Sequence, residues 1–234
     1  MIKAILLDIE GTTTPIDFVH KTLFPFAKSH IGNYVATHFD ALRHEIDALV
    51  DESTHDATYT VPVDPTEPGS VSAYLEHLID VDRKSTPLKT IQGKIWQQGY
   101  ESGELKSEVF NDVPTAFERW HTAAKVIAIY SSGSILAQQL LFRYTEHGDL
   151  TKFISANFDT TTGGKRDVES YVKIAKALGF PPQEIVFVSD IYAELDAARE
   201  AGMDVVLSLR PGNFIDEDLA KNYLAVETFE SIQA

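Results

Sequence analysis

The chain contains no cysteine among its 234 residues. This absence excludes disulfide bonds, zinc sites built on thiolates and a cysteine nucleophile. No two histidines have the HExxH spacing of a zinc-protease helix, so that class of metal hydrolase is not indicated either.

Long apolar runs and positive charge are also scarce. No uninterrupted apolar stretch is long enough to cross a bilayer, and residues 1–8 become acidic too soon for a signal peptide, so we expect a cytoplasmic protein without a membrane partner. Lys and Arg number 20 against 35 Asp and Glu, and the net charge of −15 argues against nucleic acid as a partner. A phosphate site would have to be locally cationic, which a divalent metal and a lysine would achieve.

Short apolar runs that alternate with amphipathic helical patterns dominate the rest of the sequence. This alternation is typical of a parallel α/β sheet. The expected strands are 3–7, 125–130, 153–155, 185–189 and 204–209. Gly179 and Gly202 are placed to end the helices between them. The pattern therefore predicts a Rossmann-like, doubly wound parallel sheet.

More than a hundred residues between the first two expected strands carry helical signals without strands. Ser70 is placed to cap one helix, and Thr86-Pro87 opens another. The turn-rich stretch 62–69 ahead of them is expected to be an exposed loop. We interpret residues 16–111 as an all-helical cap inserted after the first strand, and residues 1–15 and 112–234 as the catalytic core.

Polar residues follow four of the expected strands, at the edge where open parallel sheets bind their ligands. They are Asp8 and Glu10 after the first strand, Ser131 and Ser132 after the second, Lys165 after the third and Asp190 after the fourth. Two carboxylates on neighbouring strands would repel unless they shared a cation, and oxygen ligands suit Mg²⁺. A helix that begins at the serine pair can bind phosphate, and a lysine can neutralise developing charge. Together they predict a phosphoryl-transfer site.

Each of these residues alone has a simpler structural explanation. An Asp at a strand end is common as a turn former or helix cap. Ser131-Ser132-Gly133 could form only a tight strand-to-helix turn, and Lys165 could be a solvated surface residue. The stretch 163–166 lacks the Ser/Thr and the upstream glycine of a P-loop. The interpretation as a site depends on all four features occurring in order in one fold.

These four motifs resemble those of the haloacid dehalogenase superfamily, and the helical insertion resembles its common cap position. Longer strings are similar to the enolase-phosphatases, also called acireductone synthases. They are DIEGTTTPIDFVH (8–20), IQGKIWQQGYESGELK (91–106), IYSSGSILAQQLLF (129–142), FDTTTGGK (158–165), SDIYAELDAAREAGM (189–203) and RPGN (210–213). Glu10 stands where most of the superfamily has Asp, which favours the narrower resemblance.

The resemblance implies a monomeric, cytoplasmic, Mg²⁺-dependent enzyme of methionine salvage. Its substrate would be a small phosphorylated diketone, 2,3-diketo-5-methylthiopentyl-1-phosphate, which is enolised and then dephosphorylated to the acireductone. Asp8 would form an aspartyl phosphate, with Glu10 as acid and base. The metal would be held by Asp8, Asp190 and the backbone carbonyl of Glu10, with Glu194 ordering its water shell. Lys165 and one of the two serines, Ser131 or Ser132, would bind the phosphate.

The cap is expected to bring selectivity, with Phe18 near the entrance. Trp96 and Tyr100 lie four residues apart on an expected helix; they could receive the methylthio tail or simply pack the core of the cap. The base of the enolisation is left open.

The alternative function is a superfamily phosphatase for another small phosphomonoester, which would need neither Glu10 nor the 91–106 string. A phosphorylated receiver domain is disfavoured because Lys165 precedes Asp190 and the insertion is large.

Overall fold

The computed structural model describes residues 1–83 and 85–233. The chain forms two compact units. The first comprises Met1–Val19 and the chain from Lys106 onward, and the second comprises His20–Leu105. The second unit lies within the stretch 16–111 that we interpreted as a cap; its action as a cap stays a prediction.

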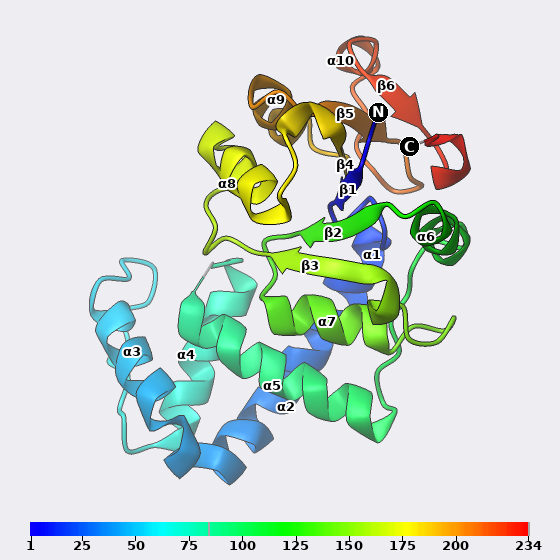
Figure 1. Ribbon diagram of the computed structural model, residues 1–234. Coiled ribbons are helices and arrows are strands. Elements are labelled where there is room, and N and C mark those ends of the chain that lie inside the picture. The colour runs from blue at the N-terminus through cyan, green and yellow to red at the C-terminus, as the bar shows by residue number, and fades with distance from the viewer. Residues whose placement is uncertain (84, 234) are drawn as a thin grey trace. The chain divides into compact units, whose positions relative to one another are not determined.

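The first unit is built on a six-stranded, all-parallel sheet with the strand order β3-β2-β1-β4-β5-β6 (Figure 1). The strands are β1 (Ala4–Leu7), β2 (Val126–Tyr130), β3 (Ile154–Phe158), β4 (Ile185–Ser189), β5 (Asp204–Ser208) and β6 (Leu224–Val226). The sequence predicted the first five to within three residues at their ends, whereas β6 was not predicted. The expected parallel α/β sheet is confirmed.

The strand order reverses at the centre of this sheet, between β1 and β4. Strands β2 and β3 lie on one side of β1, and β4, β5 and β6 follow on the other. Leu7 at the end of β1 is in register with both Ile129 and Val188. A reversal of this kind leaves a crevice at the carboxyl ends of the two central strands. Asp8 and Asp190 therefore leave neighbouring strands at the edge where a ligand is expected.

Helices cover both faces of the sheet in the first unit (Figure 1). They are α6 (Val113–Thr122), α7 (Ile135–Arg143), α8 (Val168–Leu178) and α9 (Tyr192–Glu200), with short helical segments α1 (Ile16–Phe18), η3 (Thr151–Phe153), η4 (Pro182–Glu184), α10 (Glu217–Ala220) and η5 (Phe229–Ser231). On one face, Tyr171 of α8 and Leu195 of α9 join Phe187 of β4 in the core. Alternate strand residues such as Ile129 point to the other face, where Trp120 of α6 is buried. The doubly wound arrangement is confirmed.

The second unit consists of helices joined by loops, and it has no strand among its described residues. It contains α2 (Phe24–His38), η2 (Phe39–Leu42), α3 (Arg43–Thr54), α4 (Pro68–Asp80) and α5 (Thr86–Ser102), and the π-helical turn η1 (Val19–Leu23) spans its start. Its core is formed by buried apolar residues of all four long helices, among them Ile31, Ile46, Tyr74 and Ile91. The two helices expected near residues 70–79 and 86–96 are present.

The start of α4 differs from the prediction that Ser70 caps it. The helix begins three residues earlier than a cap at Ser70 would allow, at Pro68, and Glu67 occupies the cap position. Ser70 Oγ instead accepts a hydrogen bond from the N–H of Asp64 at 2.9 Å. Proline suits the first turn because an N–H there would have no helical partner. Helix α5 starts where expected, and Ser85 Oγ accepts the N–H of Leu88 at 3.3 Å.

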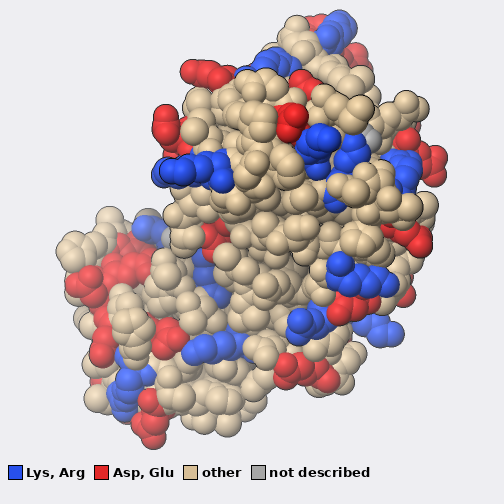
Figure 2. All heavy atoms as spheres, viewed as in Figure 1, with Lys and Arg blue, Asp and Glu red and all other residues tan. Residues whose placement is uncertain are grey.

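The surface carries charges of both signs. Figure 2 shows acidic and basic side chains interspersed over the face in view, so charge of one sign is not concentrated there. In the described part of the chain, no helix has both the length and the apolar character needed to cross a membrane.

Candidate active site

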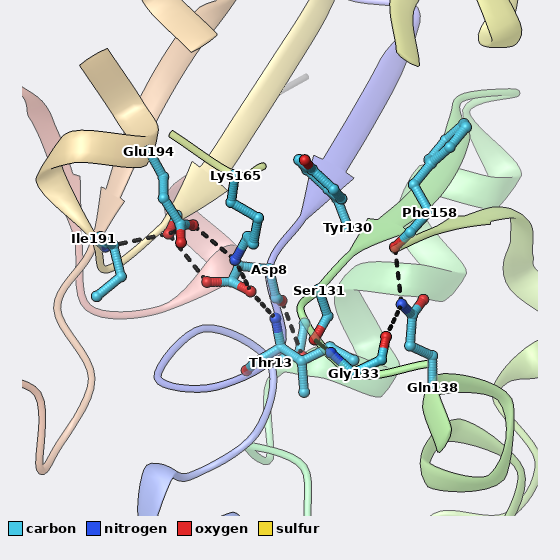
Figure 3. A network of polar contacts seen from close by, with 12 residues as sticks. Asp8, Thr13, Tyr130, Ser131, Gly133, Gln138, Phe158, Lys165, Ile191 and Glu194 are labelled. Carbon is cyan, nitrogen blue, oxygen red and sulfur yellow. Dashed lines mark hydrogen bonds and ion pairs between the residues drawn. The ribbon is translucent and has the colours of Figure 1, made fainter. Parts of the chain in front are cut away.

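Asp8 is the first residue after β1 and is 3% exposed. Its N–H donates to Val188 O at 3.0 Å, which continues the pairing of β1 with β4. The N–H of Ile9 lies 2.8 Å from Oδ1, and Lys165 Nζ lies 2.6 Å from the same oxygen (Figure 3). Ser189 Oγ lies 3.1 Å from Oδ2. Donors on both oxygens hold the carboxylate in one orientation.

A tight loop, residues 8–14, presents Asp8 and Glu10. The N–H groups of Thr13 and Thr14 both donate to Ile9 O at 2.9 Å, and Gly11 N–H donates to Thr14 O at 2.9 Å. Gly11 has φ +66°, a conformation that favours glycine. A Cβ atom at this position would lie 2.4 Å from Asp190 Oδ2. The loop and the Asp190 carboxylate are therefore in close contact, as the strand order requires.

Lys165 connects two carboxylates of the site. Its Nζ lies 2.6 Å from Asp8 Oδ1 and 2.7 Å from Glu194 Oε2. Burial lowers the pKa of Lys165, but the two carboxylates outweigh burial and raise this pKa above its usual value. Tyr171 OH donates to Lys165 O at 2.6 Å, which fixes the backbone that carries the ammonium group. The predicted cationic residue is thus placed directly against the predicted nucleophile.

Asp190 and Glu194 add buried negative charge on the β4 side of the site. Burial, followed by the charge of Asp8, raises the pKa of Asp190 to about 7. The same two causes raise the pKa of Glu194 to about 7. Ser189 Oγ lies 3.1 Å from both Asp8 Oδ2 and Glu194 Oε2, and its single proton can bond only one of them at a time. Lys165 supplies one positive charge against three carboxylates.

The serine turn, residues 131–134, follows β2 beside the loop of Asp8 and Thr13 (Figure 3). Ser131 is buried, and its Oγ accepts the N–H of Gly133 at 3.1 Å. Ser134 caps α7 by accepting the N–H of Ala137. Gln138 Nε2 donates to Gly133 O at 3.0 Å and to Phe158 O at 2.8 Å. The turn therefore forms the strand-to-helix connection of the simpler explanation, and its hydrogen bonds fix it beside the loop of Asp8; its binding of phosphate stays a prediction. Ser132 lies in the same turn and is half-buried.

An ion pair that sequence reasoning missed supports the loop of Asp8. Arg210 Nη1 and Nη2 each lie 2.9 Å from a carboxylate oxygen of Asp112, and its Nε donates to Thr12 O at 3.1 Å. The guanidinium carbon lies 4.5 Å from the ring centres of both Phe110 and Phe229. The RPGN string was the signal in the sequence, but nothing in it names Asp112 as the partner.

The three predicted substrate-binding residues outside the strand ends are all buried. Phe18 ends the short helix α1 of the first unit. In the second unit, Trp96 Nε1 donates to Leu23 O at 2.9 Å and its ring stacks on Phe24, while Tyr100 is buried on the same helix. Within their own unit, Trp96 and Tyr100 thus pack the core. Contact of any of these three residues with substrate stays a prediction.

The acidic side of the site fits a hard divalent cation. Asp8, Asp190 and the backbone carbonyl of Glu10 would form a donor set of oxygen atoms, the kind that Mg²⁺ prefers. Burial and the charge of Asp8 raise the pKa of Asp190 although the charge of Lys165 opposes them, so a further cation would stabilise the ionised carboxylate. In residues 1–83 and 85–233 no three or more His, Cys, Asp or Glu side chains form a metal cluster, so carbonyl, water or substrate oxygens would complete the coordination.

Comparisons with known proteins relate the chain to one family of hydrolases. Residues 2–202 match the family model of the haloacid dehalogenase-like hydrolases. Enolase-phosphatase E1 of Synechococcus elongatus is 51% identical over 216 residues, which cover 91% of this chain and 90% of that protein. Enolase-phosphatase E1 of Leptospira borgpetersenii is 50% identical over 208 residues and 89% of each chain. The crystal structure of the UTR4 protein of Saccharomyces cerevisiae has a TM-score of 0.82 at 32% identity, with 99% of this chain and 100% of that chain covered.

Proposed function

Because the chain belongs to the haloacid dehalogenase-like hydrolases and, within them, to the enolase-phosphatase E1 family, we propose that the residues around Asp8 carry out both halves of its reaction. The enzyme is an enolase-phosphatase of methionine salvage, which enolises 2,3-diketo-5-methylthiopentyl-1-phosphate and dephosphorylates it to the acireductone. The observation that carries the assignment of the site is the buried Lys165 ammonium, which is shared by Asp8 at the carboxyl end of β1 and by Glu194 in the first turn of α9.

In the phosphatase half, an Asp8 carboxylate oxygen attacks phosphorus in line with the bond to the substrate oxygen. That bond breaks, the phosphoryl group stays on Asp8, and Glu10 donates a proton to the departing oxygen. Glu10 then takes a proton from a water molecule, which attacks the aspartyl phosphate and releases inorganic phosphate. The donors on both Asp8 oxygens support this role, since they preset the carboxylate and leave little reorganisation for the attack.

Lys165 and the serine turn bind the phosphate in this proposal. The ammonium of Lys165 neutralises charge on the phosphoryl oxygens as they pass between donor and acceptor. The hydroxyl group of Ser131 or Ser132 and the N–H groups at the start of α7 add neutral donors. Gln138 supports this role because its Nε2 donates hydrogen bonds to Gly133 O and Phe158 O, which hold the turn against the end of β3.

Mg²⁺ belongs to the same proposal, with Asp8, Asp190 and the backbone carbonyl of Glu10 as its protein ligands and Glu194 next to its hydration shell. When bound, the cation would neutralise phosphate charge and polarise a substrate carbonyl, which makes the neighbouring C–H more acidic. The oxygen-only donor set and the raised pKa of Asp190 support this assignment.

Glu10 is the residue that we expect to distinguish the enolase from ordinary phosphatases. Its carboxylate reaches one methylene further than that of an aspartate, which would let it serve carbon and enolate oxygen as well as the leaving group. We expect Glu10→Asp to lose enolisation more than hydrolysis, measured as enol absorbance and phosphate release on the same sample. A variant with wild-type rates of both would refute this role.

Phe18, Trp96 and Tyr100 complete the proposal as the residues that select the methylthio tail, and the enzyme is proposed to be a cytoplasmic monomer. All three side chains are aromatic and buried, a character that suits a thioether better than a charged group. The expected signature of a tail contact is a raised KM for the full substrate with an unchanged KM for a diketone phosphate lacking the methylthio group.

The deciding experiment supplies the purified protein with a 2,3-diketo-1-phosphoalkane, with and without Mg²⁺, and records enol absorbance and phosphate release together. Metal-dependent enol formation followed by phosphate release is the expected result. Phosphate release from simple phosphomonoesters without enol from the diketone would identify an ordinary phosphatase instead. Asp8→Asn is expected to abolish phosphate release, and appreciable turnover by this variant would contradict the covalent route.

A further inference from the structure

Asn213 is presented to the site by a rigid turn at the carboxyl end of β5. Its N–H donates to Arg210 O at 3.1 Å, and Pro211 and Gly212 occupy the central positions of the turn. Gly212 has φ +91°, the positive φ that the third residue of a type II turn requires. Arg210, which opens the turn, is fixed by its two bonds to Asp112. Asn213 therefore has little freedom to move.

The orientation of the Asn213 amide is defined by its partners. Nδ2 donates to Gly11 O at 2.8 Å and to Ser208 O at 3.1 Å, which uses both of its protons. The opposite orientation would place Oδ1 against two carbonyl oxygens and would cost both hydrogen bonds. The remaining atom, Oδ1, is thus an acceptor whose position is fixed by the loop of the nucleophile.

Asn213 Oδ1 is buried and has no hydrogen-bond partner among the residues that the structure describes. It faces the same spot beside Gly11 as a carboxylate oxygen of Asp190. A Cβ atom on Gly11 would lie 2.7 Å from Asn213 Oδ1 and 2.4 Å from Asp190 Oδ2. Buried acceptors in folded proteins are nearly always bonded, by protein, water or ion-bound groups. A donor from outside the chain is therefore expected between Asn213 and Asp190.

We infer that Asn213 is a positioning residue for the divalent cation: its Oδ1 accepts a hydrogen bond from a water molecule of the hydration shell of Mg²⁺ beside Asp190. This inference rests on the proposed function, in which Asp190 is a ligand of Mg²⁺. Protein-bound Mg²⁺ keeps several of its water ligands. Polar groups that form hydrogen bonds with the direct ligands of a metal ion raise the affinity of the protein for that ion. The glycine at position 11 supports this arrangement, because a Cβ atom there would press against both Asn213 Oδ1 and Asp190 Oδ2.

Cation binding to the full-length, metal-free protein tests the inference without catalysis. Free Mn²⁺, a paramagnetic substitute for Mg²⁺, is titrated by electron paramagnetic resonance into wild type, Asn213→Ala, Ser208→Ala and Asp190→Asn. Asn213→Ala is expected to raise the Kd for Mn²⁺ about tenfold. Ser208→Ala is the matched control, because Ser208 Oγ donates to the same Gly11 O at 3.1 Å but offers the cation nothing. It should leave the Kd close to that of wild type.

The possible results separate three explanations. Equal weakening in Asn213→Ala and Ser208→Ala, or no weakening in Asn213→Ala, would overturn the inference and leave Asn213 as an anchor of the loop. Wild-type affinity in Asp190→Asn would instead refute the cation site of the proposed function, and the inference with it. Should Asn213→Ala not fold, a crystal structure of the Mg²⁺-bound wild type decides. A cation-bound water within hydrogen-bond distance of Asn213 Oδ1 is expected, and its absence would overturn the inference.

Discussion

Substituting Gly11 by alanine separates backbone strain from displacement of the Asp190 carboxylate. The backbone at Gly11 has φ +66°, where a Cβ atom costs about 1–2 kcal/mol. For a chain of this size the melting temperature should therefore fall by about 2–8 °C. This part of the effect concerns stability alone.

The second part of the effect concerns catalysis. The new Cβ atom would lie 2.4 Å from Asp190 Oδ2, and ordinary van der Waals contact begins near 3.4 Å. The carboxylate must therefore retreat by about 1 Å, a misplacement that can lower a rate about 100-fold. A loss of this size corresponds to about 2.7 kcal/mol of transition-state stabilisation. We thus expect Gly11→Ala to remain folded at the assay temperature but to have a kcat/KM about 100-fold below that of wild type.

Gly179 provides the matched control in the same unit. It ends α8 with φ +77°, and a Cβ atom there would meet nothing within 4 Å. Gly179→Ala should show the loss of thermal stability caused by backbone strain alone, followed by circular dichroism, and should keep the wild-type kcat/KM for phosphate release with Mg²⁺. Wild-type kinetics in Gly11→Ala, or an equal kinetic loss in Gly179→Ala, would refute the reasoning.

Two further predictions concern stability. Asp112→Ala leaves the buried Arg210 guanidinium without its carboxylate, so we expect a loss of about 3–5 kcal/mol in urea unfolding. A loss below about 1 kcal/mol would show that the pair is dispensable. The metal-free protein should become less stable as the pH rises from about 4 to 7. In the folded state Asp190 and Glu194 have pKa values of about 7, so they still bind protons that the unfolded chain has released in this range. Thermal unfolding in a chelator should show this fall, and Asp190→Asn should reduce it; an equal slope in the variant would contradict the assignment.

The central strands could be predicted from the sequence because they are buried on both faces and read as continuous apolar runs. The edge strands were harder. Strand β3 continues to Phe158. The prediction ended it at Ser155 because the polar Asn157 breaks the apolar run in the sequence. Strand β6 was missed because it has three residues, and Leu224 among them is 68% exposed. Edge strands have a partner on one side alone, so little of their pairing is encoded in local hydrophobicity.

That the candidate site residues lie close together could be predicted for a different reason. The carboxyl ends of parallel strands meet at one edge of a sheet, so the order of Asp8, Lys165 and Asp190 along the chain was enough to bring them together. The residues that support them lacked such a rule. Arg210 meets Asp112 across 98 positions of sequence, and Ser189 bridges Asp8 and Glu194 only because two strands are adjacent. Such partners depend on tertiary packing, which no local pattern specifies.

The buried polar atoms that lack a hydrogen-bond partner lie near the buried charged residues of the candidate site. Among the described residues, the buried side-chain atoms without a hydrogen-bond partner are Thr12 Oγ1, Thr14 Oγ1 and Asn213 Oδ1. All three belong to the loop after β1 or to the turn bonded to that loop through Gly11 O. Each such atom costs about 1–3 kcal/mol when it has no partner. Among the described residues these exceptions are therefore concentrated around Asp8, the proposed nucleophile. We expect a ligand and its bound water to donate the missing hydrogen bonds when the site is loaded.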